Sequence, residues 1–412
     1  MTGLTFLVLF LILMVLMVLI PRLVQRFYIP SIIAILITGI IIGPNLMDLV
    51  RKLNHLLGRG YPTEQLYIVI EAIGLLGLIF LMSLAGMESS LKLIKSEKKA
   101  VTILSLLTFL MPAVTGFFVY RAFRPMEIIG QLFYASLFAS HSVGIVFPII
   151  KELKVVKTRF GVAVLSSTVI TDIGSLILLA ICVQLTRHNS SVKIIESISL
   201  FDKIDINSLG VLFYPVFILT VFIFIFLSLW LVPKLGKWLF NRIHPQDDSR
   251  LTFFLISVLG VVMIGELVGV SVIVGAFIAG MALSGLKPFY AENGLLFKKI
   301  EGTGYGFFIP FMFLSIGMKT DILVLFNANE NFYITLWTVI GLTGSKLLSG
   351  WLAMRLSGFS NQKAVLAGLM TIPQLSATLA AATVGLSLKI IPLNFLTLLL
   401  CYQSLQPFLY RF

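Results

Sequence analysis

The chain has 412 residues, of which 58% are hydrophobic and only 12% are charged, and its mean hydropathy is +1.03. Soluble domains carry roughly twice that share of charged residues, so the composition excludes an ordinary soluble protein and indicates a multi-span helical membrane protein. The two cysteines, Cys182 and Cys401, both lie within apolar runs, so no disulfide framework is predicted.

Apolar stretches long enough to cross a bilayer recur along the whole chain. The first reaches Ile20 and has no basic segment before it, so it is predicted to be a retained span and not a cleaved signal peptide. We therefore expect an all-α membrane protein with about 13 transmembrane helices, near residues 3–20, 27–43, 66–87, 100–120, 127–150, 158–186, 209–232, 251–267, 270–285, 304–318, 332–354, 363–386 and 391–410.

The basic residues favour one orientation of these spans. With the N-terminus outside and the C-terminus inside, 20 of the 31 lysines and arginines fall in loops on the inner side, as the positive-inside rule requires. The same distribution accounts for the net charge of +13, because a basic inner surface attracts the anionic lipid headgroups of the bilayer. The charge therefore predicts no nucleic-acid partner.

One acidic residue, Asp172, lies near the middle of a predicted span. The run from Gly161 to Cys182 around it is apolar and long enough to cross a bilayer. An ionised carboxylate at that depth costs about 3 kcal/mol or more, so such residues mark ion paths and proton relays by default. Asp172 is therefore predicted to lie on an ion path, with a structural hydrogen bond between helices as the alternative.

A lysine is buried at a similar depth on another predicted span. Lys346 lies near the middle of the run at 332–354, too deep for its side chain to reach the membrane surface easily. Pairing with Asp172 would lower the cost of burying both charges. Lys346 is therefore predicted to be the charge partner of Asp172, with competition for the Asp172 site as the alternative.

The two halves of the chain resemble each other at a fixed offset. Residues 81–89 align with residues 312–320 at an offset of 231, and residues 29–43 resemble residues 269–285 at a slightly larger one. The shift is an odd number of spans, so the copies have opposite topology, as in many transporters. We expect a first inverted repeat at 1–186, a linker helix with its flanking loops at 187–250, and a second repeat at 251–412.

The same offset pairs two interrupted spans. It aligns residues 140–144 in the fifth span with residues 371–375 in the twelfth, and both spans are rich there in hydroxyl, glycine or proline residues. Broken helices leave carbonyl groups and dipole ends facing a cavity, where they coordinate a cation or offset a charge. Paired interruptions therefore predict an ion site at the membrane midplane. The alternative is that small polar residues only pack the helices.

Polar side chains near Asp172 are the predicted cation or water ligands, because hard cations prefer oxygen. These hydroxyls belong to Thr171, Ser140, Ser142 and Ser175. His141 lies beside them in the interrupted fifth span. Two interpretations of it stay open: it senses pH or shares the proton, or it only donates a packing hydrogen bond.

The chain resembles the monovalent cation/proton antiporters, in the branch that contains bacterial sodium/proton and potassium/proton exchangers. The resemblance covers essentially the whole chain and is carried by residues 29–44, 84–88, 269–280 and, most specifically, 308–318. It implies a homodimer in the bacterial inner membrane, with two inverted repeats and two crossed discontinuous helices, the fifth and twelfth. By resemblance, Asp172 binds cation and proton in turn, Lys346 matches the family's buried lysine, and the crossing contains His141, Gly144, Pro373, Gln374 and Ser376.

Three departures from the family pattern qualify this expectation. Thr171 stands where relatives usually have Asp, Asn or Gln, so a single carboxylate remains and electroneutral exchange is expected. Gln374 to Ser376 replaces an Arg-Gly-Glu-like turn of many relatives, which leaves the choice of cation open. The chain ends at Phe412, directly after the last predicted span, so we expect that a cytosolic regulatory domain carried by many relatives is missing from it.

The predicted function is therefore secondary active exchange of Na+ or K+ for protons by alternating access at Asp172. A cation channel, a proton-coupled symporter and a membrane sensor without transport are the alternatives. An intramembrane enzyme is disfavoured, because aspartyl proteolysis needs two facing carboxylates and a zinc site needs clustered histidines, whereas three of the four histidines fall in predicted loops. No catalytic residue, bound metal or cofactor is predicted.

Overall fold

The computed structural model describes the chain with several gaps, and every regular element within the described residues is helical. The described residues are 2–24, 31–56, 63–88, 97–141, 146, 150, 154–155, 158–189, 213–243, 247–270, 272–289, 295–319, 329–374, 378, 381, 385 and 388–391. They belong to two compact units, Met1–Leu81, Glu301–Thr335 and Leu393–Phe412 in the first, and Met82–Ile300 and Leu336–Pro392 in the second. Each unit is described by itself.

The first unit is built on short and long apolar helices near the N-terminus and a pair of elements from the second half of the chain. Its elements are α1 (Thr2–Val24), α2 (Ser31–Ile42), α3 (Leu49–Leu56), α4 (Thr63–Glu88) as far as Leu81, the π-helical turn η6 (Gly304–Phe308) and α14 (Ile309–Lys319). The short helix α3 was not expected; it begins where Asp48 accepts the main-chain N–H of Arg51 at 3.3 Å, as an N-cap does.

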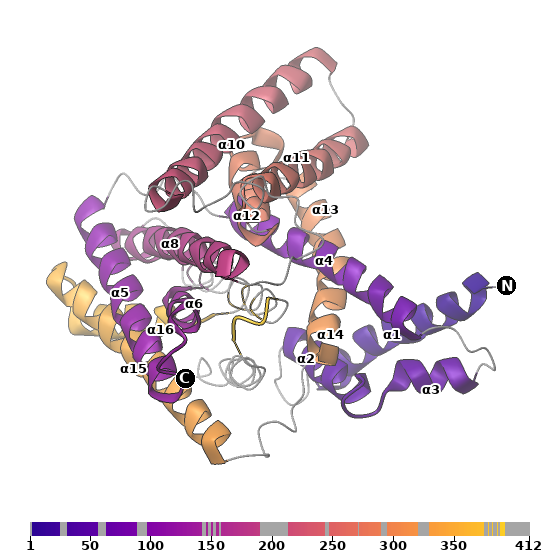
Figure 1. The fold of residues 1–412 in the computed structure, drawn as a ribbon. Helices are drawn as coiled ribbons and strands as arrows, with labels where there is room; N and C mark the ends of the chain where they lie inside the picture. The colour runs from indigo at the N-terminus through magenta and orange to yellow at the C-terminus, as the bar shows by residue number, and fades with distance from the viewer. Residues whose placement is uncertain are drawn as a thin grey trace. The chain divides into compact units, whose positions relative to one another are not determined.

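The second unit holds most of the remaining helices. Figure 1 labels these helices and colours them by their position in the chain. Its elements are the end of α4, α5 (Lys98–Phe123), α6 (Ile128–Ala139), α8 (Arg159–Asn189), α10 (Phe213–Ile243), α11 (Asp247–Leu267), α12 (Val272–Leu283), η5 (Lys287–Phe289) and, for the most part, α13 (Leu295–Thr303), α15 (Asn329–Leu356) and α16 (Asn361–Thr371). Helices α5, α6 and α8 pack against one another, and α12 packs against α10, α11 and α8.

Most predicted spans coincide with these helices. Two of them, at 127–150 and 363–386, are interrupted as predicted: α6 ends at Ala139 and α16 ends at Thr371. Helix α10 runs on to Ile243, well past the predicted end at 232, because lysines lower the hydropathy there without ending the helix. The ammonium group of Lys234 lies 3.7 Å from the centroid of the Trp230 ring, a contact that stabilises this polar extension. The run at 391–410 lies outside the described residues except for its first residue.

Within the described residues, five helices are long and apolar enough to cross a membrane: α4, α5, α8, α10 and α11. Helices α10 and α11 also expose large apolar side chains over much of their length. They include Leu219, Phe222, Ile223, Phe226, Ile256, Met263 and Ile264. A surface of this kind is stable against lipid tails and not against water.

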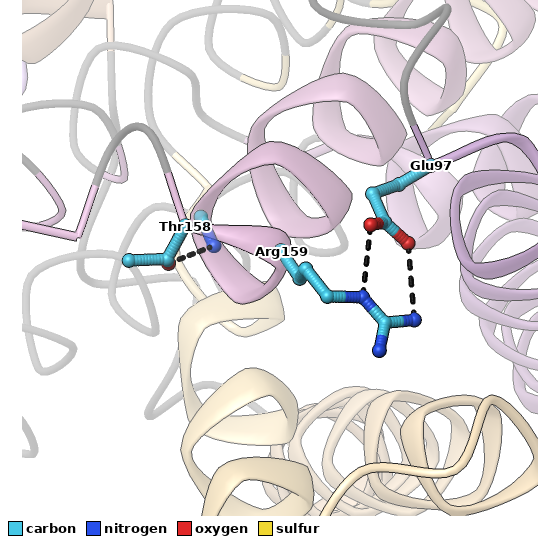
Figure 2. Close-up of polar contacts among 4 residues, drawn as sticks. Glu97, Thr158 and Arg159 are labelled. Atoms are coloured by element: carbon cyan, nitrogen blue, oxygen red, sulfur yellow. Dashed lines mark hydrogen bonds and ion pairs between the residues drawn. The ribbon is translucent and has the colours of Figure 1, made fainter.

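A core cluster in the second unit ties the start of α8 to α5, α15 and α16. It includes Leu104, Phe160, Val164, Met354 and Met370, all with at most 5% of their surface exposed. At its edge, the guanidinium group of Arg159 binds both carboxylate oxygens of Glu97, at 2.8 and 3.2 Å (Figure 2). The same group lies over the ring of Phe359. The side chain of Arg159 is 71% exposed, so this ion pair aligns the helix ends more than it stabilises them.

Glycines permit close helix crossings in both units. In the first unit, a Cβ atom on Gly39 of α2 would lie 2.9 Å from the Cα atom of Gly317 on α14. In the second unit, a Cβ atom on Gly280 of α12 would lie 2.8 Å from the Cα atom of Ser83, near the end of α4, and one on Gly86 would lie 2.8 Å from the main-chain nitrogen of Met281. Main-chain atoms fill these spaces, so no larger residue fits without moving a helix.

We expect the substitutions Gly280→Ala and Gly317→Ala to lower the melting temperature of the purified protein in detergent. Overpacking costs about 1–3 kcal/mol when the neighbours are side chains, and here the neighbours are main-chain atoms that cannot rotate away. The matched control is Gly260→Ala in α11, where nothing lies within 4 Å of the added atom. That control should be neutral or stabilising by up to about 1 kcal/mol, because alanine favours the helix. Equal melting temperatures for all three variants would contradict the crossings.

Candidate functional site

Four segments of the second unit meet around the interrupted end of α6. Asp172 comes from the interior of α8, Lys346 from the interior of α15, Ser140 and His141 from the residues that follow α6, and Gln374 from the residues that follow α16. Asp172 is 4% exposed and Lys346 is completely buried. Two charged groups that are far apart in sequence are therefore both removed from solvent near one interrupted helix.

The carboxylate of Asp172 is bound by the main chain at the break. The N–H group of His141 donates a hydrogen bond to Oδ1 of Asp172 at 2.9 Å. This N–H is available because Ser140 has an extended conformation, with φ −69° and ψ 152°, which ends α6 one residue earlier. The interruption therefore supplies the donor that holds the carboxylate in place.

The carbonyl groups at the end of α6 are bound by two buried side chains. Lys346 donates a hydrogen bond from Nζ to the carbonyl oxygen of Ser140. Nε2 of Gln374 lies 2.9, 3.1 and 2.8 Å from the carbonyl oxygens of Leu137, Phe138 and Ser140. The last carbonyls of a helix have no partner within the helix and carry the negative end of its dipole, so an ammonium and an amide are suitable partners for them.

A second set of hydrogen bonds joins the two interrupted spans and fixes the lysine. Oγ of Ser140 lies 2.6 Å from Oγ1 of Thr378. Thr371 donates to the carbonyl oxygen of Lys346 at 3.1 Å, and Ser349 donates to the same oxygen at 3.0 Å. Close packing of α15 on α16 allows this, since a Cβ atom on Gly350 would lie 2.6 Å from the Cα atom of Gly368.

Thr171 and His141 form a further buried contact beside Asp172. Oγ1 of Thr171 lies 2.8 Å from Nδ1 of the His141 ring. The same hydroxyl lies 3.0 and 2.9 Å from the carbonyl oxygens of Ser167 and Thr168 in the preceding turn of α8. Thr171 and His141 are each 1% exposed, so both side chains belong to the interior of the site.

The structure brings together most of the residues that the sequence singled out. Asp172, Thr171, Ser140, His141, Lys346 and Gln374 all take part in the contacts above, and Pro373 is buried beside Gln374 after the end of α16. Ser175 lies one turn along α8, where its hydroxyl donates to the carbonyl oxygen of Asp172 at 2.9 Å. Ser142, Gly144 and Ser376 lie outside the described residues.

Two features of the site did not follow from the sequence. Among the described residues, which include both Lys346 and Asp172, no ion pair joins these two. The side chain of Lys346 instead donates a hydrogen bond to the carbonyl oxygen of Ser140. Thr378 was not among the predicted site residues. The abundance of hydroxyl side chains in the twelfth predicted span was the signal that could have indicated it.

Comparisons with known proteins identify the family of the chain. The profile of the family described as "Sodium/hydrogen exchanger, transmembrane" matches residues 11–406. The probable Na(+)/H(+) antiporter 3 of Methanocaldococcus jannaschii is 36% identical over 376 residues, which cover 90% of this chain and 86% of that protein. The Na(+)/H(+)-K(+) antiporter GerN of Bacillus cereus is 26% identical over 89% of this chain and 84% of its own length.

The fold is also similar to that of a solved structure, the sodium proton antiporter MjNhaP1 from Methanocaldococcus jannaschii at pH 8. The TM-score is 0.63 at 17% sequence identity, over 99% of this chain and 95% of that one. The protein is thus a multi-pass, all-α membrane transporter and not an enzyme. The chain belongs to the transmembrane sodium/hydrogen exchanger family.

We expect Gln374→Leu to lower the melting temperature in detergent, because two carbonyl groups of α6 would lose the side-chain donor described here. Each unsatisfied buried polar group costs about 1–3 kcal/mol. The matched control is Ser166→Ala, since the buried hydroxyl of Ser166 has no hydrogen-bond partner among the described residues. That control should leave the melting temperature nearly unchanged. A Gln374→Leu variant as stable as the Ser166→Ala variant would show that these carbonyls do not need the amide.

Proposed function

We propose that the protein exchanges one monovalent cation for one proton across the membrane, and that both bind in turn at Asp172. The observation that carries the proposal is a carboxylate only 4% exposed in the interior of a spanning helix, held by a main-chain N–H at the break in a neighbouring helix. Intramembrane carboxylates of this kind mark ion and proton pathways. The named activities of the relatives, Na(+)/H(+) and Na(+)/H(+)-K(+) exchange, make Na+ the first cation to assay and K+ the second.

Competition for one carboxylate couples the two fluxes. A cation and a proton each neutralise the charge of Asp172, so the site holds one or the other. Crossing with the carboxylate ionised and empty would place a bare charge in a medium of low dielectric constant, which is costly. Only the states in which Asp172 holds a cation or a proton cross readily. The exchange of one for the other follows from this restriction.

Oxygen atoms near the break are the proposed cation ligands besides Asp172. Ser140 and Thr378 face each other with their hydroxyl groups, and Ser142 follows two residues after Ser140 in sequence. Hydroxyl, carbonyl and carboxylate oxygens are the ligands that hard cations prefer. Alternating access by the bundle that contains the two interrupted spans would expose this set to each side in turn.

Lys346 is the proposed charge partner of Asp172, acting through space and not through an ion pair. Its ammonium group is held at the end of α6, where it offsets the helix dipole. A positive charge that stays in the site through the cycle leaves a single titrating carboxylate. The exchange is therefore proposed to be electroneutral, with one cation moved for one proton.

The helix crossings support the proposed inverted repeats. The sequence pairs the second predicted span with the ninth and the third with the tenth. The two glycine-mediated contacts join the second span to the tenth (α2 with α14) and the third to the ninth (α4 with α12). A two-fold relation between the repeats 1–186 and 251–412 would exchange one contact for the other.

The homodimer, the outside N-terminus and the inside C-terminus are further parts of the proposal.

We expect Asp172→Asn to abolish exchange in liposomes with an imposed pH gradient, followed with a lumenal pH dye while Na+ or K+ is added. An amide neither binds nor releases a proton in the working range, so neither flux has a carrier. The matched control is Glu71→Gln, which removes a half-exposed carboxylate of the first unit that pairs with Lys319. The control should exchange at close to the wild-type rate. Undiminished exchange in Asp172→Asn would exclude this site, and cation flux that does not need a proton gradient would indicate a channel.

We expect the exchange rate to be independent of the membrane potential. One cation moved against one proton transfers no net charge, so the field does no work on the cycle. The measurement compares initial Na+-driven rates in liposomes clamped at zero and at about −100 mV, where one transferred charge would be worth about 2.3 kcal/mol. A rate that changes steeply between the two potentials would contradict the one-to-one exchange and leave Asp172 as the binding site.

A further inference from the structure

His141 makes two separate contacts in the site, one through its main chain and one through its ring. Its main-chain N–H binds Oδ1 of Asp172, and its ring contacts Thr171 through Nδ1. The residue is 1% exposed, so the imidazole ring of the residue whose main chain binds this carboxylate is buried. The main-chain hydrogen bond to Asp172 and the ring contact with Thr171 together fix the position of the ring.

The contact with Thr171 favours one tautomer of the ring. A threonine hydroxyl has one proton, and two carbonyl oxygens that can only accept, those of Ser167 and Thr168, lie within hydrogen-bond distance of it. When the hydroxyl donates to the main chain, its lone pairs face Nδ1, and Nδ1 must then carry the proton. In the neutral ring this leaves Nε2 as a bare acceptor.

The other ring nitrogen, Nε2, is buried, and none of the described residues is its hydrogen-bond partner. An orphaned buried N–H is rarer in proteins than an acceptor with a free lone pair, which again favours the proton on Nδ1. Buried polar atoms normally have a hydrogen-bond partner, and a water molecule entering the proposed site would supply one to Nε2.

We infer that Nε2 of His141 is a hydrogen-bond acceptor for a water molecule in the hydration shell of the transported cation. The inference rests on the proposed exchange at Asp172 and adds a second contact to it. Water has the O–H donors that a bare imidazole nitrogen needs, whereas the cation itself prefers oxygen ligands. Of the charged side chains described here, Asp172 and Lys346 face this part of the site, and the ammonium of Lys346 is already bound to Ser140.

The roles of two residues follow from this. His141 is a positioning residue that holds a partly hydrated cation beside Asp172 and so sets the cation affinity. Thr171 is the anchor of the His141 ring, and its hydroxyl is occupied by the ring and by main-chain carbonyls. Thr171 is therefore inferred to act on the cation through the ring of His141.

The experiment compares His141→Gln with His141→Asn in the liposome exchange assay, with the half-saturating cation concentration and the maximal rate measured separately. A glutamine amide reaches the position of Nε2, whereas the shorter asparagine amide reaches only that of Nδ1. Loss of one hydrogen bond to the hydrated cation should raise the half-saturating concentration about tenfold in His141→Asn. His141→Gln should recover most of that loss, and the maximal rate should change less than about threefold in both.

A second pair of variants tests the anchor and does not alter the histidine. Thr171→Val removes the hydroxyl that holds Nδ1 and should also raise the half-saturating concentration. Thr168→Val is the matched control, because Thr168 is a buried threonine of the same helix whose hydroxyl donates to the carbonyl oxygen of Val164 at 2.9 Å. It should leave the half-saturating concentration unchanged. Together with the ¹⁵N spectrum of the His141 ring, which reports its tautomer, this pair tests the anchor even when a His141 variant does not fold.

The outcomes separate this inference from the proposed function. Exchange that survives in Asp172→Asn would overturn the proposed site itself. Exchange lost in Asp172→Asn, with equal cation affinity in His141→Asn, His141→Gln and the wild type, would overturn only the role of Nε2. A lower maximal rate with unchanged half-saturation would show that His141 is structural. An ¹⁵N spectrum of the labelled ring with the proton on Nε2 would also overturn the inference.

Discussion

The carbonyl groups at the interrupted end of α6 are the constraint on which the rest of the site depends. Leu137, Phe138 and Ser140 are buried away from bulk solvent, so the protein supplies donors to their carbonyl groups. Lys346 and Gln374 do so from α15 and from the residues after α16. The break in one helix therefore requires an ammonium and an amide from two others, and this requirement brings the three segments together.

The same break explains why Asp172 remains available. The ammonium of Lys346 is bound to Ser140, while Asp172 receives one neutral main-chain N–H from His141. A direct ion pair between two buried charges would be strong enough to exclude other cations. The lysine satisfies the helix end and the carboxylate keeps a weaker donor, which leaves Asp172 available to the cation and the proton of the proposed exchange.

The sequence predicted the depth of both charges and the positions of both interruptions, since hydropathy and helix-breaking residues report position along a span. It could not predict that Lys346 binds Ser140 and not Asp172, because the direction in which a side chain projects depends on how the helices pack. Nor could it indicate that Thr171 contacts the ring of His141, two residues 30 positions apart in the chain. The glycines at 39, 86, 280 and 317 could be recognised as a repeat, but the contacts between them required the fold.

The glycines at the helix crossings follow the internal repeat of the sequence, whereas the two buried charged residues do not. The repeat offset of 231 that relates Gly86 to Gly317 pairs Asp172 with Gln403 and Lys346 with Thr115, so neither charge has a charged counterpart in the other repeat. An inverted repeat needs similar backbone packing in both halves, because the two halves exchange roles as access alternates. The bound ion needs no such similarity. In the proposed exchange, one acid and one base, each contributed by a different proposed repeat, form a single site, and a single site with one titrating group would carry one proton or one monovalent cation at a time.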